Sequence, residues 1–341
     1  MRKKKLSALK FGCLAACLFV AMTATLGYAQ KTVHMTYSTF FPAPHKNAVL
    51  ASEWAKEIEK QTNGAVKIDM FVGGTLTPAD QCYDGVVKGI SDIGFSVLSY
   101  TKGRFPFMEV LDLALGCRSG YKYTKLCNAF YEKFHPKELD EVKVMYLHGH
   151  GPGIVHTKKK PVHKLEDLKG LKIRCTGTTQ KIVSHLGALP VGMTQTETYD
   201  ALSKGVVDGL VSPLETLKGF KFAEVVKYTT EDYGASYGMC FFVVMNKKKW
   251  ASLPKDVQAT IEKINQEWIE KQGKAWDEID KEGREYALSK GVELIQLSKE
   301  EDERWTKAVQ PLFQEYITSM KAKGLPGEEA VAFCQEWLNK N

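Results

Sequence analysis

The residues with the clearest potential for chemistry lie around Arg174, at the end of a short apolar run. A guanidinium is always charged, and its planar fork of donors fits a carboxylate through two parallel hydrogen bonds. Two polar segments, 193–202 and 205–209, follow it in the chain. On spacing alone, an arginine that binds the carboxylate of a ligand is one of two equally supported interpretations. A surface arginine paired with Glu166 or Asp167 is the ordinary alternative.

Other candidates for ligand contact are aromatic or polar side chains near predicted strand ends. Phe40 and Phe41 follow the first predicted strand and would suit an aromatic or apolar acid, with core packing as the alternative. His148 and His150 lie two apart, so in a strand they would face the same side. A metal pair there would lack a third ligand, and we expect His150 to line a pocket instead, with packing as the alternative. The further candidates are Ser96, Thr176, Thr194 and Tyr237.

The elements that must position these side chains alternate between strand and helix, which predicts an α/β fold. Apolar runs predict strands at 33–40, 66–72, 92–97, 142–148, 171–175, 206–211 and 241–245. Helical periodicity predicts helices at 45–61, 79–88, 121–134, 179–186, 197–204, 216–226, 255–290, 300–323 and 327–338. The helix at 255–290 would be about 50 Å long at about 1.5 Å per residue. It is therefore longer than one small domain is wide.

The first 29 residues have the pattern of a secretory signal peptide, with a basic start, an apolar stretch and small residues before a cut after Ala29. Beyond them no apolar run reaches the length of a membrane span, about 18 residues. The remaining chain has the length of two domains.

The charge and cysteine content exclude several classes of function. Five of the 47 basic residues and none of the 40 acidic ones lie in the signal, so the mature net charge is only about +2. A nucleic-acid partner is therefore not expected. An oxidising compartment permits disulfides, and Cys117 with Cys127 is the one plausible pair, with free buried cysteines as the alternative. Without a Cys-x-x-Cys motif, no metal or cofactor is expected.

Five segments in order along the chain, 89–94, 167–174, 193–209, 224–228 and 250–254, resemble the solute-binding proteins of TRAP (tripartite, ATP-independent) transporters, the DctP-like family. The resemblance covers nearly the whole mature chain. It implies a periplasmic protein with a two-domain binding-protein fold, mixed doubly wound sheets, a ligand cleft between the domains and a long helix spanning both.

The same resemblance implies a domain division, partners and a role for Arg174. Domain I would comprise 30–155 plus 246–341, and domain II 156–245. Arg174 would bind the carboxylate of a small organic acid, and the closed protein, a monomer in most of the family, would deliver it to small and large membrane subunits. Ser212 stands where the family often has an asparagine that supports the carboxylate. This difference leaves the ligand open among a C4-dicarboxylate, an aromatic or branched 2-keto or amino acid, and a sulfonate, with a monocarboxylate slightly favoured.

Two other classes of function compete with this interpretation. A binding component of an ATP-driven importer would share the two-domain plan, but the long helix and the 167–174 segment argue against it. A secreted enzyme would need a catalytic set. The segment 234–238 matches a hydrolase nucleophile elbow in its letters, but a strand is predicted after it, and the last histidine of the chain, His185, precedes it. We therefore expect binding without catalysis.

Overall fold

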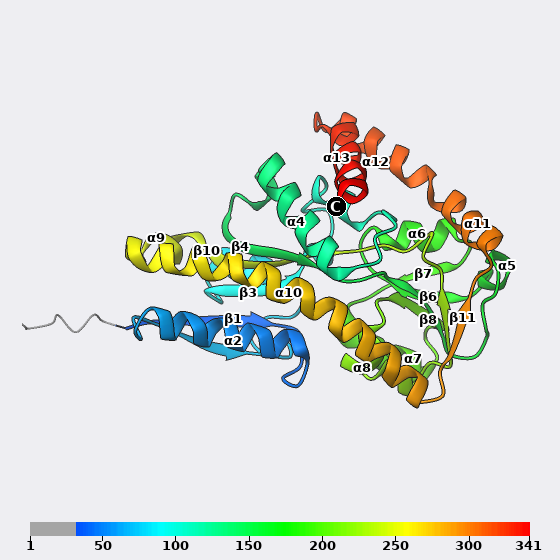
Figure 1. The fold of residues 1–341 in the computed structure, drawn as a ribbon, viewed down its shortest axis with the longest axis horizontal. Helices are drawn as coiled ribbons and strands as arrows, with labels where there is room; N and C mark the ends of the chain where they lie inside the picture. Colours follow the sequence, from blue (N-terminus) through cyan, green and yellow to red (C-terminus); the bar gives the residue numbers. More distant parts are fainter. Residues whose placement is uncertain (1–31) are drawn as a thin grey trace, which may run out of the picture.

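The structure is a computed structural model that describes residues 32–341, so the predicted signal peptide lies outside the described residues. Two mixed β-sheets lie one after the other along the length of the molecule (Figure 1). The first has the strand order β2-β1-β3-β10-β4, in which β1, β2 and β3 are parallel and β10 is antiparallel to its neighbours. Its strands are β1 (Val33–Thr39), β2 (Val66–Phe71), β3 (Ile93–Val97), β4 (Val142–Gly149) and β10 (Cys240–Asn246).

The second sheet has the order β11-β9-β5-β8-β6-β7. Strands β6, β7 and β8 are parallel, and β5 is antiparallel to β8 and β9. Its strands are β5 (Ile154–Thr157), β6 (Lys172–Cys175), β7 (Leu189–Gly192), β8 (Gly209–Ser212), β9 (Tyr228–Glu231) and β11 (Glu293–Gln296). The chain thus forms the predicted α/β fold with two mixed sheets.

Sheet membership bears on where the two domains divide. Strand β10 lies in the segment predicted for domain II, but it pairs with β3 and β4 of the first sheet. Strand β11 lies in the segment predicted for domain I, but it pairs with β9 of the second sheet. On this basis we propose crossings between the domains close to Gly151, close to Gly238 and within the long helix at 255–289.

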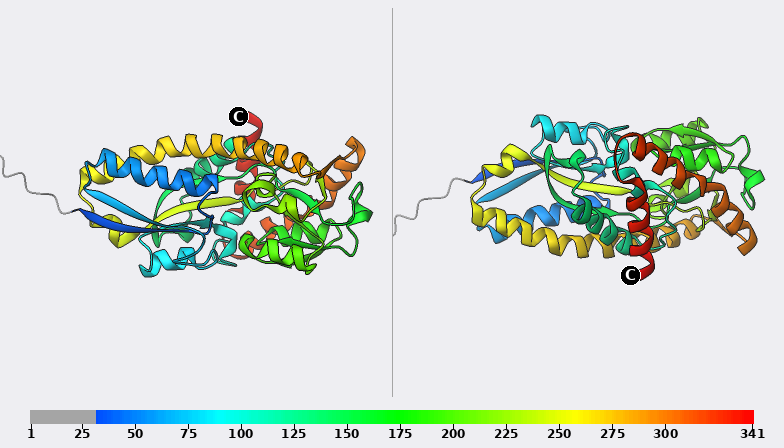
Figure 2. Two further views of the ribbon diagram at one scale, coloured as in Figure 1. Left: turned by 90° about the horizontal axis from the view of Figure 1, so that it is seen from below. Right: turned by 90° about the horizontal axis from the view of Figure 1, so that it is seen from above.

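Helices cover both sheets and join them. They are α2 (Lys46–Gln61), α3 (Cys82–Lys88), α4 (Gly120–Phe134), α5 (Leu165–Leu168), α6 (Thr179–His185), α7 (Gln195–Lys204), α8 (Glu215–Gly219), α9 (Lys247–Ala251), α10 (Lys255–Ser289), α11 (Lys299–Val309), α12 (Pro311–Ala322) and α13 (Gly327–Lys340). The 35-residue α10 packs on α2, α4 and β4 at one end and on α8 at the other. Figure 2 shows it running along one side of both sheets, which confirms the predicted long helix spanning both domains.

Two predicted helices are wrong in their extent. The helix predicted at 300–323 is two helices, α11 and α12, because Pro311 cannot donate a helical hydrogen bond and begins α12 at its first turn. The helix predicted at 216–226 is the short α8 followed by a 3₁₀ turn, Phe222–Glu224. Lys221 between them has a φ of 60°, in the left-handed region, which ends the first piece.

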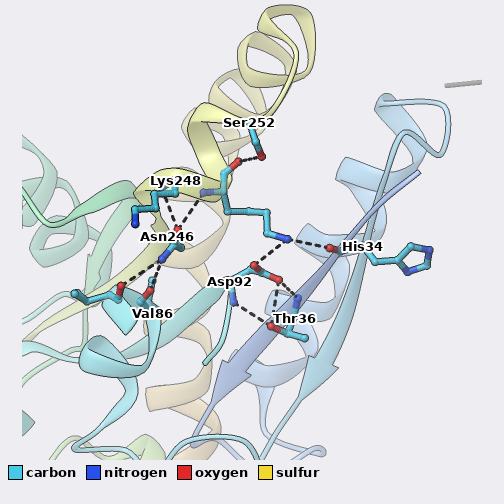
Figure 3. Close-up of polar contacts among 9 residues, drawn as sticks. His34, Thr36, Val86, Asp92, Asn246, Lys248 and Ser252 are labelled. Carbon is cyan, nitrogen blue, oxygen red and sulfur yellow. Dashed lines mark hydrogen bonds and ion pairs between the residues drawn. The ribbon is translucent and has the colours of Figure 1, made fainter. Parts of the chain in front are cut away.

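A polar network closes the first sheet at the end where its parallel strands begin (Figure 3). Asn246 caps α9 by accepting bonds from two amides of its first turn, and its amide nitrogen donates to the Val86 carbonyl at 2.8 Å. Asp92 accepts from the Thr36 amide at 2.9 Å and forms an ion pair with Lys249 at 3.1 Å. The opposite, carboxyl ends of these strands point toward the second sheet.

Candidate functional site

A cavity with about 360 Å³ of free space lies where strands of both sheets end. Ligands in open α/β sheets bind outside the carboxyl ends of the strands, so this is the expected place for a site. The lining residues come from both sheets: Phe40, Phe41, Val97, Tyr100, His150, Arg174, Thr176, Gln195, Ser212, Pro213, Glu215, Thr216, Phe220, Tyr237, Met239 and Phe241.

Arg174 carries the positive charge in one wall of the cavity. It is the third residue of β6, the strand that pairs with β7 and β8, and only 2 % of its surface is exposed. Its Nε and Nη2 atoms donate to the Met193 carbonyl at 3.1 and 2.9 Å. Among the described residues, no carboxylate forms an ion pair with it. A buried cation without a counter-charge is costly, and within the described residues this guanidinium lacks one.

Tyr100 of the first domain lies beside Arg174 of the second. Burial raises the pKa of the Tyr100 hydroxyl, and the nearby positive charge of Arg174 acts in the opposite direction. The same hydroxyl accepts a bond from the Gln195 amide at 3.1 Å. The Gln195 side-chain nitrogen is buried and has no partner in the described chain. It is an unused donor in the wall of the cavity, and sequence reasoning missed both Tyr100 and Gln195.

Aromatic rings make up much of the remaining wall. Phe40 and Phe41 follow β1 and stack on each other with ring centroids 4.3 Å apart. Phe220 of the second domain lies 6.0 Å from Phe41, and Phe241 of β10 lies 6.1 Å from it. Phe41 therefore packs against other rings and also lines the cavity, and its contact with a ligand stays a prediction. Such a wall favours a flat apolar ligand.

His150 and Tyr237 lie together on the side of the cavity where the chain crosses between the domains. Their rings are 5.5 Å apart, edge to face. Burial lowers the pKa of His150 to about 4, so the imidazole is neutral at pH 7. Its Nδ1 donates to the Gly151 carbonyl, which leaves Nε2 as an acceptor. Tyr237 donates its hydroxyl to the Val211 carbonyl at 3.0 Å.

The hydroxyls of Ser212 and Thr216 are hydrogen-bonded to each other. Thr216 donates to the Pro213 carbonyl at 2.8 Å, so Ser212 donates to the Thr216 oxygen at 2.7 Å. Ser212 therefore offers a ligand only acceptor positions in this arrangement. Thr176 follows β6 and also lines the cavity, with 8 % of its surface exposed.

An acidic residue that the sequence analysis did not select completes the site. Glu215, in the first turn of α8, accepts a bond from the His45 ring at 2.9 Å, and both side chains are buried. His45 precedes α2 in the first domain, so this contact joins the two domains. The cavity thus contains one basic and one acidic side chain.

Six of the eight predicted contacts line this cavity, and Ser96 and Thr194 do not. Successive residues of a strand face opposite sides. Val97 therefore takes the cavity side of β3, and Ser96 donates to the Ala79 carbonyl at 2.7 Å on the other. Thr194 precedes α7, and its hydroxyl donates to the Glu197 carboxylate at 2.6 Å. The next residue, Gln195, lines the cavity instead.

A larger cavity, with about 630 Å³ of free space, lies at another edge between the domains. Its lining includes two acidic residues, Glu109 and Asp112, beside Lys102 and Lys181. Burial raises the pKa of Asp112, so this carboxyl is poorly solvated as a charge. The lining of this cavity includes neither Arg174 nor any ring of the aromatic wall, so it is a weaker place for an organic anion.

Three other expectations concern metals, cysteines and membrane spans. Among residues 32–341, no group of three potential ligands is placed to hold a metal ion. Cys117 and Cys127 are both free, so the pairing considered for them is not formed. Within the same residues, no helix combines the length and the apolar character that crossing a membrane requires.

Comparison with known proteins identifies the family. The model for bacterial extracellular solute-binding protein, family 7 (DctP), matches residues 38–319. The chain belongs to this family. It is a periplasmic solute-binding protein of the TRAP type, as the resemblance predicted.

Relatives of this TRAP solute-binding protein share its whole fold. The C4-dicarboxylate-binding periplasmic protein DctP of Vibrio cholerae is 26 % identical over 80 % of this chain and 82 % of its own. A TRAP solute-binding protein from Desulfovibrio salexigens is 35 % identical, with a TM-score of 0.79 over 90 % of this chain and 96 % of its own. A marine metagenome TRAP protein specific for aromatic acids, solved with metahydroxyphenylacetate, is 30 % identical, with a TM-score of 0.86 over 90 % and 99 %.

Proposed function

We propose that this protein captures an aromatic monocarboxylate in the periplasm through Arg174 and delivers it to the small and large membrane subunits of a TRAP transporter. The observation that carries the proposal is a buried guanidinium that has no carboxylate partner within residues 32–341, in a cavity walled by aromatic rings. The aromatic-acid specificity of the marine metagenome relative supports the ligand class.

The arrangement suits binding by closure of two domains about a hinge. Arg174 and Thr176 extend from the second sheet, whereas Phe41 and Tyr100 follow strands of the first. A carboxylate held by Arg174 would therefore place its ring among side chains of both domains. In this proposal the protein acts as a monomer, makes and breaks no covalent bonds, and needs no cofactor.

A C4-dicarboxylate fits these residues less well. Among the lining residues, Arg174 is the only arginine or lysine, and Glu215 would lie in the same cavity as the second carboxylate of the ligand. Like charges at short range in a poorly solvated site repel strongly. We therefore place the C4-dicarboxylates behind the aromatic acids as candidates.

The test is a thermal-shift and calorimetry panel on residues 30–341 with benzoate, phenylacetate, succinate and an uncharged benzamide. A ligand at about 100 times its Kd should add about 2.7 kcal/mol to the free energy of unfolding. We expect shifts with the aromatic acids that disappear in Arg174→Ala. Lys172→Ala, an exposed position on the same strand, is the matched control and should behave as wild type.

Retention of aromatic-acid binding in Arg174→Ala would refute the role of this residue. A response confined to succinate would refute the aromatic class while leaving the family assignment intact.

A further inference from the structure

We infer that Glu215 and His45 form a second polar subsite, which selects aromatic carboxylates that also carry a hydrogen-bond donor, either a hydroxyl or an ammonium group. This inference rests on the proposed function and narrows its ligand class. The subsite is defined as the Glu215 carboxylate, oriented by His45 and facing the cavity.

The hydrogen bonds of His45 settle which atoms are already in use. Its Nδ1 accepts from the Asn47 amide at 3.2 Å, so the ring nitrogen that donates to Glu215 is Nε2. This bond goes to the Oε2 atom of Glu215 at 2.9 Å. The Glu215 Oε1 atom has no hydrogen-bond partner in the described part of the chain, although only 4 % of the residue is exposed.

A carboxylate can accept about four hydrogen bonds, and within the described residues the Glu215 carboxylate accepts one, from His45. Its free oxygen is not among the side-chain atoms that the described protein shields fully from solvent, so it can be reached from the cavity that Glu215 lines. A ligand that displaces water from this oxygen must replace the lost hydrogen bond, because a buried polar group without a partner is costly. Since a carboxylate oxygen only accepts, the partner must donate.

Contacts from both domains fix the positions of Glu215 and His45, as the selective binding of a ligand requires. The Glu215 amide donates to an oxygen of Asp280 on α10 at 2.9 Å. A Cβ atom on Gly219 would lie 2.4 Å from His45 Nε2 and 2.7 Å from Glu215 Oε2, so the backbone of α8 closes the back of the pair. The Phe41 and Phe220 rings lie 4.5 and 5.2 Å from the His45 ring. The subsite therefore adjoins the aromatic part of the wall.

The rest of the lining is consistent with this assignment. His150 presents Nε2 as an acceptor, and Ser212 offers only acceptor positions. Arg174 and Gln195 supply the donors for a carboxylate. The cavity thus carries donors for one ligand group and acceptors for another, which complements a hydroxy acid or a zwitterion better than a plain aromatic acid.

The experiment measures Kd by calorimetry on residues 30–341 with three matched acids: phenylacetate, mandelate and phenylglycine. They differ at one carbon, which carries hydrogen, hydroxyl or ammonium. Benzoate and 3-hydroxybenzoate repeat the comparison with the donor on the ring. We expect at least one donor-bearing acid to bind roughly tenfold to a hundredfold more tightly than its unsubstituted partner. The tighter of mandelate and phenylglycine distinguishes hydroxyl from ammonium.

Glu215→Gln then tests whether Glu215 is the residue that binds the donor group of the ligand. The ratio of the affinity of the donor-bearing acid to that of its unsubstituted partner should fall toward one. The fall should be larger for an ammonium, because the substitution also removes the negative charge of Glu215. Glu285→Gln, at an exposed glutamate on α10, should keep the wild-type ratio. Circular dichroism verifies folding, and if Glu215→Gln does not fold, the wild-type ratios decide alone.

Equal affinities across every matched set in wild type would overturn the subsite, and so would an unchanged ratio in Glu215→Gln. In either case Arg174-dependent binding of phenylacetate would still support the proposed function. If none of the five acids bound, the proposed function itself would fail.

Discussion

Lowering the pH from 7 to 5 is expected to destabilise the folded protein through His156. This side chain is fully buried in β5, where Nε2 donates to the Ser212 carbonyl at 3.0 Å and Nδ1 accepts from the Thr229 hydroxyl at 2.9 Å. Both ring nitrogens are satisfied in the neutral form. Burial lowers the pKa of His156 from 6.5 to about 4.

The sign follows from where the protons bind. Between pH 6.5 and 4 the unfolded chain protonates His156 and the folded chain does not, so acid favours unfolding. Stability from the neutral ring is present above pH 6.5 and is lost as the pH falls toward 4. Each pH unit in this window costs about 1.4 kcal/mol, so going from pH 7 to 5 costs roughly 2 kcal/mol.

Urea unfolding of the ligand-free protein at pH 7 and pH 5 measures this difference. His156→Gln removes the titrating group and lowers stability at both pH values, so the quantity compared is the change between them. Wild type should lose roughly 2 kcal/mol more than His156→Gln. Buried carboxyls such as Asp112, whose pKa is raised, act in the opposite direction in both proteins and cancel in the comparison.

His34→Gln is the control, because that side chain is 64 % exposed, and its pH dependence should match wild type. Equal pH dependences in wild type and His156→Gln would refute the reasoning, since the buried neutral ring would then contribute nothing to proton linkage.

Three further predictions concern packing, capping and thiols. Gly283→Ala should destabilise by about 1–3 kcal/mol in urea unfolding, because its Cβ would lie 2.2 Å from the Leu214 carbonyl, where α10 meets α8. Asn246→Ala should cost about 1–2 kcal/mol by the same measurement, since the cap of α9 is lost. With a thiol reagent, six cysteines of the mature chain should react after unfolding, and in the native state the half-buried Cys117 should react first. Only four reactive thiols after unfolding would indicate a disulfide.

The long helices were predictable because their signal repeats many times. In α10 the residues Val257, Ile261, Ile264 and Trp268 recur on one face, and all four are buried. Strands β5, β7, β9 and β11 were missed. Each has only four residues, too few to establish alternation, whereas the equally short β6 and β8 overlap the longer segments predicted at 171–175 and 206–211. Strand β7 even contains Pro190, which is tolerated because β7 is the edge strand of its sheet.

Arg174 could be selected from sequence because the local segments that carry the family resemblance, 167–174 and 193–209, surround it. Glu215 could not be selected in the same way, since its partner His45 is 170 residues away and belongs to the other domain. Nothing in the spacing of two such residues indicates that they meet. Only the arrangement of the two sheets brings them together.

The positions of the site residues nevertheless follow one rule. Phe41 follows β1, Tyr100 follows β3, Thr176 follows β6 and Glu215 follows β8, each within a few residues of the strand end. The carboxyl ends of parallel strands meet at one edge of a sheet, and here the edges of two sheets face each other. Any polar residue just beyond such an end is therefore a candidate for the cavity. By that criterion Glu215, three residues after Ser212, is as good a candidate for the cavity as Ser212.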